Sequence, residues 1–173
     1  MKQLNLLNLW VLNYNIPGGK NIRGVSVMNA YKLLVPKESD TEQNLKLAGY
    51  LGWCNEMLHA SVLMFDDVMD RSITRRGRLC WYKLEDIQLS AINDSFMIKA
   101  GIYQILKEHF THLKCYTQLL ELFNDMCFIA FLAEREQRPS QKTNRILIKR
   151  ISMEFYQKIN MKVPFVGCFS TQQ

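Results

Sequence analysis

The sequence predicts an all-α protein, folded as a bundle of long apolar helices. Apolar residues recur at three- and four-residue steps through most of the chain, which is the spacing of one helix face. No segment alternates polar and apolar residues over a length that would indicate a strand, and no internal repeat is present. With 173 residues, 48% of them hydrophobic and 22% charged, the chain can bury the core of one domain.

The first helix is predicted from the start of the chain to Pro17-Gly18-Gly19, which must end it. The segment 18–24 is then a glycine-flanked turn that carries Lys20 and Arg23. Such a turn can offer backbone N–H groups and two cations to a phosphate, or it can be a plain helix break with solvated bases. The turn alone does not decide between these two interpretations. A short helix over 25–35 follows it.

The longest helix is predicted from about residue 41 to Asp70. Ser39 and Glu42 have the spacing of a capping box, which places the helix start close to them. Two glycines on this helix, Gly49 and Gly52, are expected to let another helix approach closely.

The remaining elements are read from composition and periodicity. We expect a loop over 71–84, a helix capped by Ser90, and a further helix over 117–134. The polar stretch 134–144 is predicted to be a linker, and a last helix is expected over about 145–162.

Three carboxylates lie at the C-terminal end of the longest predicted helix, and they are the most informative feature of the sequence. Asp66 and Asp70 are four residues apart and share one helix face, whereas Asp67 is rotated by about 100° and flanks them. Like charges at this spacing disfavour a helix by roughly 0.2–0.5 kcal/mol. A divalent cation between the two carboxylates would remove this penalty, and Mg²⁺ accepts such a ligand set when a substrate phosphate completes its shell.

The alternative interpretation is that these aspartates lie in water and pair loosely with Arg71, Arg75 and Arg76. Against it stands the almost uncharged run 58–65 that precedes them, which places the acids at the mouth of a core. We therefore favour a site.

Composition excludes few classes of function. The net charge of +6 suits phosphates or acidic partners, but it is common among proteins. The basic residues are scattered except at 75–78 and 142–150, with no recognition motif, so nucleic-acid binding is not expected. No run of about 18 apolar residues is present, so no membrane span is expected.

The cysteines and histidines do not indicate a zinc site or a disulfide framework. His109 and His112 are spaced as HxxH but have no further ligand at zinc-like spacing. Reduced thiols and a cytoplasmic location are expected, because the cysteines are odd in number, widely spaced and without a CxxC pair. They are Cys54, Cys80, Cys115, Cys127 and Cys168.

Several motifs, taken in order, resemble the eukaryotic farnesyl diphosphate synthases, which are trans-isoprenyl diphosphate synthases of the polyprenyl synthetase family. The resemblance is close over about 13–125 and fades beyond. It implies an isoprenoid-synthase-type helical bundle and a homodimer. The motifs are Gly18-Gly19-Lys20 with Arg23-Gly24, Gly52-Trp53-Cys54 with Glu56, Asp66-Asp67-Val68-Met69-Asp70, Thr74-Arg75-Arg76-Gly77, Cys80-Trp81-Tyr82 and Ala91-Ile92-Asn93-Asp94.

Members of this family condense an allylic diphosphate, dimethylallyl or geranyl, head to tail with isopentenyl diphosphate. Mg²⁺ held by aspartates draws off the allylic diphosphate, and the isopentenyl double bond attacks the carbocation that remains before a proton is lost. The resemblance implies that Asp66 and Asp70 are catalytic Mg²⁺ ligands with Asp67 as a supporting ligand. Arg75 would be a catalytic cation on the allylic diphosphate.

The resemblance also implies which residues bind the second substrate. Lys20, Arg23 and Arg76 would hold isopentenyl diphosphate. His59 stands where many animal relatives have glutamine, and it can still donate a hydrogen bond to a diphosphate.

Ser61 and Val62 are expected to influence product length. They lie four and five residues before Asp66, where animal farnesyl synthases usually have bulky aromatics that stop chain growth. Small residues there predict a deeper pocket and longer products. The alternative is that Phe96 or Met97 from the next helix fills the gap.

One departure from the family pattern is large. The family carries a second aspartate-rich motif on a later helix, and no second DDxxD occurs in these 173 residues. We expect residues 1–173 to form a single partial domain, a truncated first half of the fold whose own turnover is doubtful. The alternative hypothesis is a non-catalytic helical subunit that binds diphosphate or pairs with a full-length synthase.

Overall fold

The computed structural model describes residues 2–136, and the predicted all-α fold is confirmed. Five helices account for most of it: α1 (Lys2–Asn15), α2 (Ile22–Leu34), α3 (Glu42–Met69), α4 (Ser90–Phe110) and α5 (Tyr116–Glu136). The predicted linker 134–144 begins inside α5, which continues through Glu136, and the rest of it and the helix expected over 145–162 lie outside the described residues.

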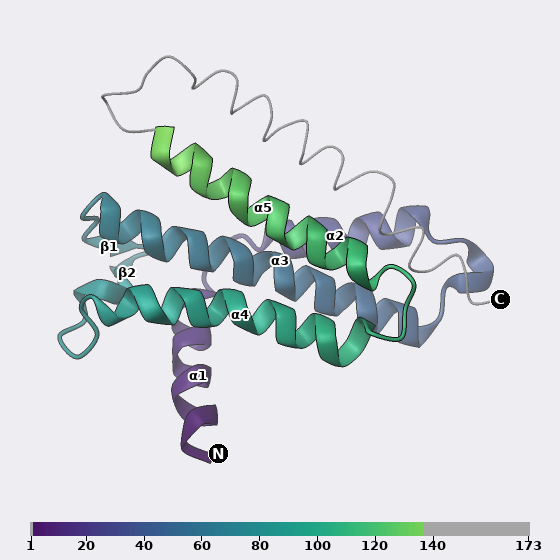
Figure 1. Ribbon diagram of the computed structural model, residues 1–173, viewed down its shortest axis with the longest axis horizontal. Helices are drawn as coiled ribbons and strands as arrows, with labels where there is room; N and C mark the ends of the chain where they lie inside the picture. The colour runs from purple at the N-terminus through teal and green to yellow at the C-terminus, as the bar shows by residue number, and fades with distance from the viewer. Residues whose placement is uncertain (1, 137–173) are drawn as a thin grey trace.

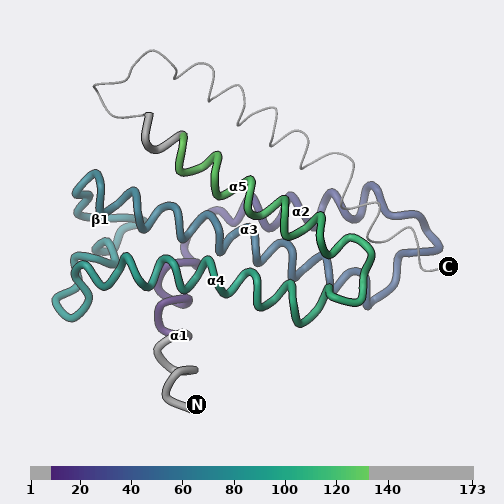
Figure 2. Tube along the Cα trace, viewed as in Figure 1, coloured from purple at the N-terminus to yellow at the C-terminus, as the bar shows by residue number. Residues whose placement is uncertain are grey.

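The longest helix, α3, is the centre of the bundle. It packs against α2, α4 and α5, and in Figure 1 it lies between α5 and α4 while α1 runs crosswise to them. The chain trace shows the same order, with α3 between α5 and α4 (Figure 2). The face that α3 buries recurs at helical spacing, for example at Leu47, Leu51, Cys54 and Leu58. Each large apolar side chain buried in this way contributes about 1.5–3 kcal/mol.

Glycines allow α2 and α3 to approach closely at one point. A Cβ atom on Gly52 would lie 3.1 Å from the carbonyl oxygen of Gly24, so a side chain there would push the helices apart. The expectation for Gly52 is therefore confirmed. For Gly49 it is wrong, because a Cβ atom there would meet nothing within 4 Å.

Two predicted helix caps are wrong in detail. Thr41, not Ser39, precedes α3, and its hydroxyl accepts the N–H of Asn44 at 3.2 Å. Ser90 is already inside α4, and the residue before it, Leu89, makes no side-chain capping bond. Both helices begin within two residues of the predicted positions, because apolar periodicity decides where a helix lies and the exact cap adjusts to the incoming chain.

The segment expected as a loop over 71–84 contains a short hairpin. Strand β1 (Thr74–Arg75) pairs antiparallel with β2 (Arg78–Leu79), and both residues of the turn between them, Arg76 and Gly77, have positive φ angles of 53° and 75°. Two positive φ angles in a two-residue loop are the geometry of a type I′ hairpin turn. The prediction missed this hairpin because strands of two residues have no alternation to detect.

Aromatic packing joins the segment after the hairpin to α1 and α4. The ring centroid of Trp81 lies 4.5 Å from the ring centroid of Trp10 and 4.9 Å from that of Tyr14. Its indole N–H donates to Asp94 of α4 at 2.8 Å. These contacts hold the C-terminal part of α1 against the end of α3.

Cys54, Cys80 and Cys127 are free and buried, as expected. The expectation of reduced thiols is wrong for Cys115, which is disulfide-bonded, because sequence spacing does not report which side chains meet in the fold. Among the described residues, no helix has the length and hydropathy needed to cross a membrane.

Candidate functional site

The C-terminal end of α3 places two carboxylates on one face, as predicted. The N–H of Asp70 donates to the carbonyl oxygen of Asp66 at 2.8 Å, which is the i to i+4 relation of one helical turn. Asp70 is the C-cap residue of α3 and is exposed, whereas the side chain of Asp66 is largely covered. The negative end of the helix dipole lies at the same place, so this position favours a cation.

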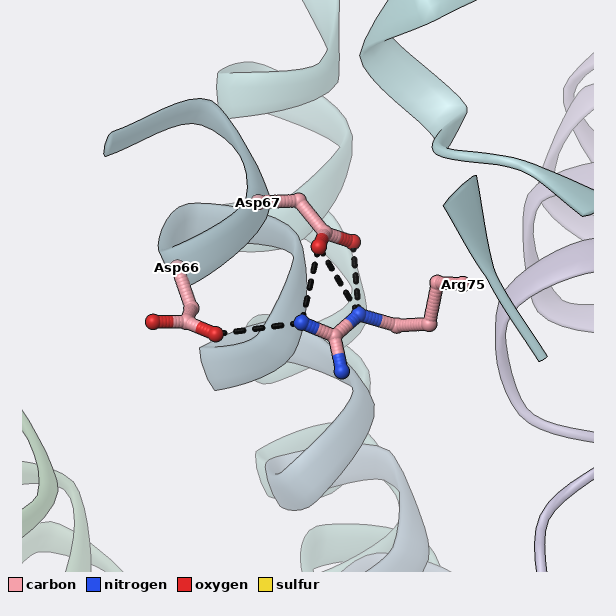
Figure 3. A network of polar contacts seen from close by, with 3 residues as sticks. All are labelled: Asp66, Asp67 and Arg75. Carbon is pink, nitrogen blue, oxygen red and sulfur yellow. Dashed lines mark hydrogen bonds and ion pairs between the residues drawn. The ribbon is translucent and has the colours of Figure 1, made fainter. Parts of the chain in front are cut away.

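Arg75, on β1, binds two of the three carboxylates, those of Asp66 and Asp67 (Figure 3). Its Nε donates to both oxygens of Asp67 at 2.8 Å, and its Nη2 lies 2.7 Å from Asp67 Oδ1 and 3.1 Å from Asp66 Oδ2. The hydrogen bonds with Asp67 are the main cause of the raised pKa of Arg75. The alternative interpretation, in which arginines pair with the aspartates, is therefore observed for Arg75, as a fixed ion pair rather than a loose one.

This ion pair separates the roles open to the three aspartates. Asp67 is buried and both of its oxygens accept hydrogen bonds from Arg75, so it holds the guanidinium in place. Asp66 uses one oxygen for Arg75, and within the described residues its Oδ1 and the carboxylate of Asp70 accept no hydrogen bond. Arg75 likewise keeps Nη1 without a partner among the described residues.

The donor set fits Mg²⁺ only in part. In the stretch that the structure describes, no three His, Cys, Asp or Glu side chains are close enough to share a metal ion. Two carboxylates with available oxygens, Asp66 and Asp70, do suit an ion that keeps several waters and completes its shell with phosphate oxygens.

Cys80 also belongs to this site, and no sequence pattern predicted its role. Its thiol is buried, and burial together with the neighbouring Asp67 raises its pKa to about 11. The thiol therefore stays protonated at neutral pH and can donate to Asp67.

Arg76 points to the opposite side of the hairpin from Arg75. Its Nη1 donates to three successive carbonyl oxygens at the end of α1, those of Asn15 at 3.0 Å, Ile16 at 2.8 Å and Pro17 at 2.9 Å. These carbonyls have no partner within the helix, so a cation there caps α1 and favours its dipole. A Cβ atom on Gly19 would lie 3.0 Å from Arg76 Nη2, so only glycine lets the turn lie this close.

The pKa of His59 shows that the positive charges of the predicted cations act on the same side chain. Burial is the main cause that lowers its pKa to about 4, and the positive charges of Arg23, Arg76 and Arg75 follow in that order. The charges of three arginines that are far apart from His59 or from one another in sequence thus act on one imidazole, which is neutral at pH 7. Lys20 is exposed and lies in the turn before α2, whereas Arg23 lies in the first turn of α2, which begins at Ile22, inside the turn predicted over 18–24.

Glu56 holds the first turn of α2, which carries Arg23, and the sequence did not reveal this role. Its Oε1 accepts the backbone N–H of Gly24 at 2.7 Å, and its side chain is buried under α2. Its charge also favours the protonated form of Arg76. The motif that contains Glu56 was noted in the sequence, but a single buried acid has no spacing that predicts a partner 32 residues away.

The surroundings of Ser61 and Val62 bear on the expected pocket floor. Ser61 is fully buried, and the hydroxyl of Ser95 on α4 donates to its carbonyl oxygen at 2.8 Å. Phe96 instead packs edge-on against Phe65, with ring centroids 5.0 Å apart. Val62 is half-buried against the core. The role of Ser61 and Val62 in product length stays a prediction.

Fold and site together define a helical-bundle protein with carboxylates at the end of its longest helix and cations gathered beside them. Residues 7–162 match the family model described as "Polyprenyl synthetase", and the chain belongs to this family. It is 41% identical over 148 residues to a farnesyl pyrophosphate synthase of Ganoderma lucidum, covering 86% of this chain and 41% of that protein.

Two other relatives match the chain with similar identity and coverage. The chain is 44% identical over 146 residues to a farnesyl pyrophosphate synthase of Kluyveromyces lactis, covering 83% of this chain and 42% of that one. It is 41% identical over 150 residues to a farnesyl pyrophosphate synthase of Gallus gallus, covering 86% of this chain and 41% of that protein. The chain therefore spans well under half the length of these relatives.

Proposed function

We propose that this chain carries the first metal and diphosphate site of a prenyltransferase of isoprenoid biosynthesis. The reaction is the Mg²⁺-dependent, head-to-tail condensation of an allylic diphosphate, dimethylallyl or geranyl, with isopentenyl diphosphate. One observation carries the proposal: carboxylates with available oxygens and a cluster of cations meet at the end of α3. Relatives named farnesyl pyrophosphate synthases support the choice of substrates.

Asp66 and Asp70 are the residues that would hold Mg²⁺, through the oxygens that Arg75 leaves available. Bound Mg²⁺ would supply charge neutralisation for the leaving diphosphate. Asp67 is the positioning residue for Arg75, whose Nη1 remains able to donate to an allylic diphosphate. Positioned cations of this kind stabilise developing charge without reorganising during the reaction.

Lys20, Arg23, His59 and Arg76 form the proposed isopentenyl diphosphate side. Neutral His59 can donate one hydrogen bond to a phosphate oxygen without adding to the repulsion among the arginines. Arg76 Nη1 is already engaged with three carbonyl oxygens. We propose that Arg76 acts mainly by fixing the segment that carries Lys20 and Arg23, and through its charge.

The second proposed function is a non-catalytic helical subunit that binds diphosphate or pairs with a full-length synthase. Large apolar side chains on α4 and α5 are exposed, among them Phe96 at 53% and Phe128 at 63%, and they suit a homodimer or such a pairing. Sedimentation showing a compact monomer at all concentrations would contradict the pairing.

Turnover and calorimetry separate the two functions. The chain is incubated with isopentenyl and geranyl diphosphate and Mg²⁺, and product is measured. In parallel, Mg²⁺ is titrated with and without an unreactive allylic diphosphate analogue. We expect weak Mg²⁺ binding alone and much tighter binding with the analogue, and Asp66→Asn should abolish the difference. Tight binding of Mg²⁺ alone, or no effect of the analogue, would refute the proposed site.

The cytoplasmic location is also a proposal. It rests on the cysteines without paired spacing, three of which are free and buried. Cell fractionation tests it.

A further inference from the structure

The fold contains a cavity whose lining does not include the ion pair of Arg75. It has a volume of about 350 Å³ and is bounded by the end of α1, α2 and α3. This volume is in the range of sites for small molecules. Its lining includes none of Lys20, Arg23, His59 or Arg75, so it is separate from the proposed diphosphate site. The lining is largely apolar and includes Ile16, Val25, Met28, Gly49, Trp53 and Glu56.

Glycines create this space. The backbones of Gly24 and Gly52 touch where α2 crosses α3, which forms a closed side of the cavity. Gly49 lies one turn before Gly52, and a Cβ atom there would meet nothing within 4 Å. The lack of a side chain at Gly49 therefore leaves room rather than allowing backbone contact.

Glu56 is the charged group of this cavity. Its side chain is only 8% exposed, and its Oε1 is already bonded to the N–H of Gly24. Its Oε2 accepts no hydrogen bond from any described residue, and Glu56 forms no ion pair within 2–136. Glu56 Oε2 is not among the fully buried side-chain atoms that lack a partner in 2–136, so it remains accessible, and an N–H donor in the cavity can form a charge-assisted hydrogen bond with it.

Trp53 adds a second feature that favours a cation. Trp53 lines the cavity and is 55% exposed, so it adds an aromatic side chain to the cavity wall. Indole is the aromatic ring that attracts cations most strongly. We propose that this cavity binds organic ammonium ions, whose N–H groups donate to Glu56 Oε2 beside Trp53 while the hydrocarbon packs against Ile16, Val25 and Met28. The proposal goes beyond the proposed function and does not depend on it.

Calorimetry with n-hexylammonium, without any diphosphate or Mg²⁺, tests the proposal. Because the chain carries a net charge of +6, non-specific attraction of a cation is disfavoured. We expect saturable binding at one site, at least ten-fold tighter than for 1-hexanol, which has the same hydrocarbon without the charge. Binding of hexylammonium no tighter than hexanol, or no binding up to millimolar concentration, would overturn the proposal.

Two variants localise the binding. Glu56→Gln keeps an oxygen that can accept from Gly24, and it should weaken hexylammonium at least ten-fold while leaving hexanol unchanged. Gly49→Leu fills the cavity without touching Glu56 and should weaken both ligands, whereas its control Gly49→Ala should retain binding of both. If Glu56→Gln does not fold, Gly49→Leu decides alone. Wild-type affinity in Gly49→Leu would place the ligand elsewhere and overturn the proposal.

Discussion

Arg75 and Arg76 are neighbours in sequence, yet they stabilise two different regions of the molecule. Arg75 binds carboxylates at the end of α3, whereas Arg76 binds carbonyl oxygens at the end of α1. The hairpin produces this divergence: Arg75 is the last residue of β1, and Arg76 begins a turn with positive φ. One short hairpin thus couples the carboxylate side of the site to the segment with Lys20 and Arg23.

The two regions also differ in which groups compensate the charge of the arginine. The Arg75 region is compensated, since a buried aspartate lies against the guanidinium. The Arg76 guanidinium donates to neutral carbonyl oxygens; burial lowers its pKa, and the charge of Glu56 opposes part of this shift. A mutation should therefore cost more in the first region, where removing one partner leaves a charge without its counter-ion.

The largest expected effect is that of Asp67→Asn. It removes the charge opposite Arg75 and weakens three contacts, so we expect a loss of roughly 3 kcal/mol in the free energy of unfolding. Urea denaturation measures it. The control is Asp70→Asn, whose carboxylate is exposed and has no hydrogen-bond partner among the described residues, and it should change stability by less than about 0.5 kcal/mol. Equal losses in both variants would contradict the assigned role of Asp67.

Arg76→Leu should have the next largest effect. Leucine keeps part of the apolar stem but leaves the carbonyl oxygens of Asn15, Ile16 and Pro17 without this donor. We expect a loss of about 2 kcal/mol, together with faster hydrogen exchange in α1 than in α4. Uniformly faster exchange in both helices would mean that Arg76 stabilises the whole bundle rather than the end of α1.

His59 should make stability depend on pH. Its pKa is about 4 in the folded chain and near 6.5 when unfolded, so below pH 6.5 the unfolded state binds more protons. The stabilisation is complete above pH 6.5 and is lost as the pH falls from 6.5 to 4. Because solvent screens the partly exposed ring, we expect a loss of about 1 kcal/mol. Thermal unfolding across this range measures it, and His59→Gln should remove this part of the slope.

The smallest effects should come from substitutions at two glycines, which should change the stability in opposite directions. Gly19→Ala places a Cβ atom 3.0 Å from Arg76 Nη2 and should cost up to about 1 kcal/mol. Gly49→Ala meets nothing within 4 Å inside a helix and should stabilise by about 0.5–1 kcal/mol. Chemical denaturation of both variants tests the pair. A stabilising Gly19→Ala would show that Arg76 does not need the turn to lie so close.

The sequence by itself determined the helices and the pair Asp66 and Asp70. The capping-box spacing of Ser39 and Glu42 located the start of α3 to within a residue or two. A spacing of four residues is enough to stack two side chains, because backbone hydrogen bonds within one helix fix that relation. The turn after α1 was likewise found from its composition, but it is shorter than the predicted segment 18–24, because α2 begins at Ile22 and Arg23 lies in the helix.

Only the tertiary structure decided which partners these residues have. Arg75 meets Asp67 across a hairpin too short to show alternation, and Arg76 reaches carbonyl oxygens about 60 residues earlier in the chain. Glu56 and the low pKa of His59 likewise depend on burial between helices that are distant in sequence. Spacing along one helix is a local quantity, whereas burial and ion pairing are set by which surfaces the packed helices cover.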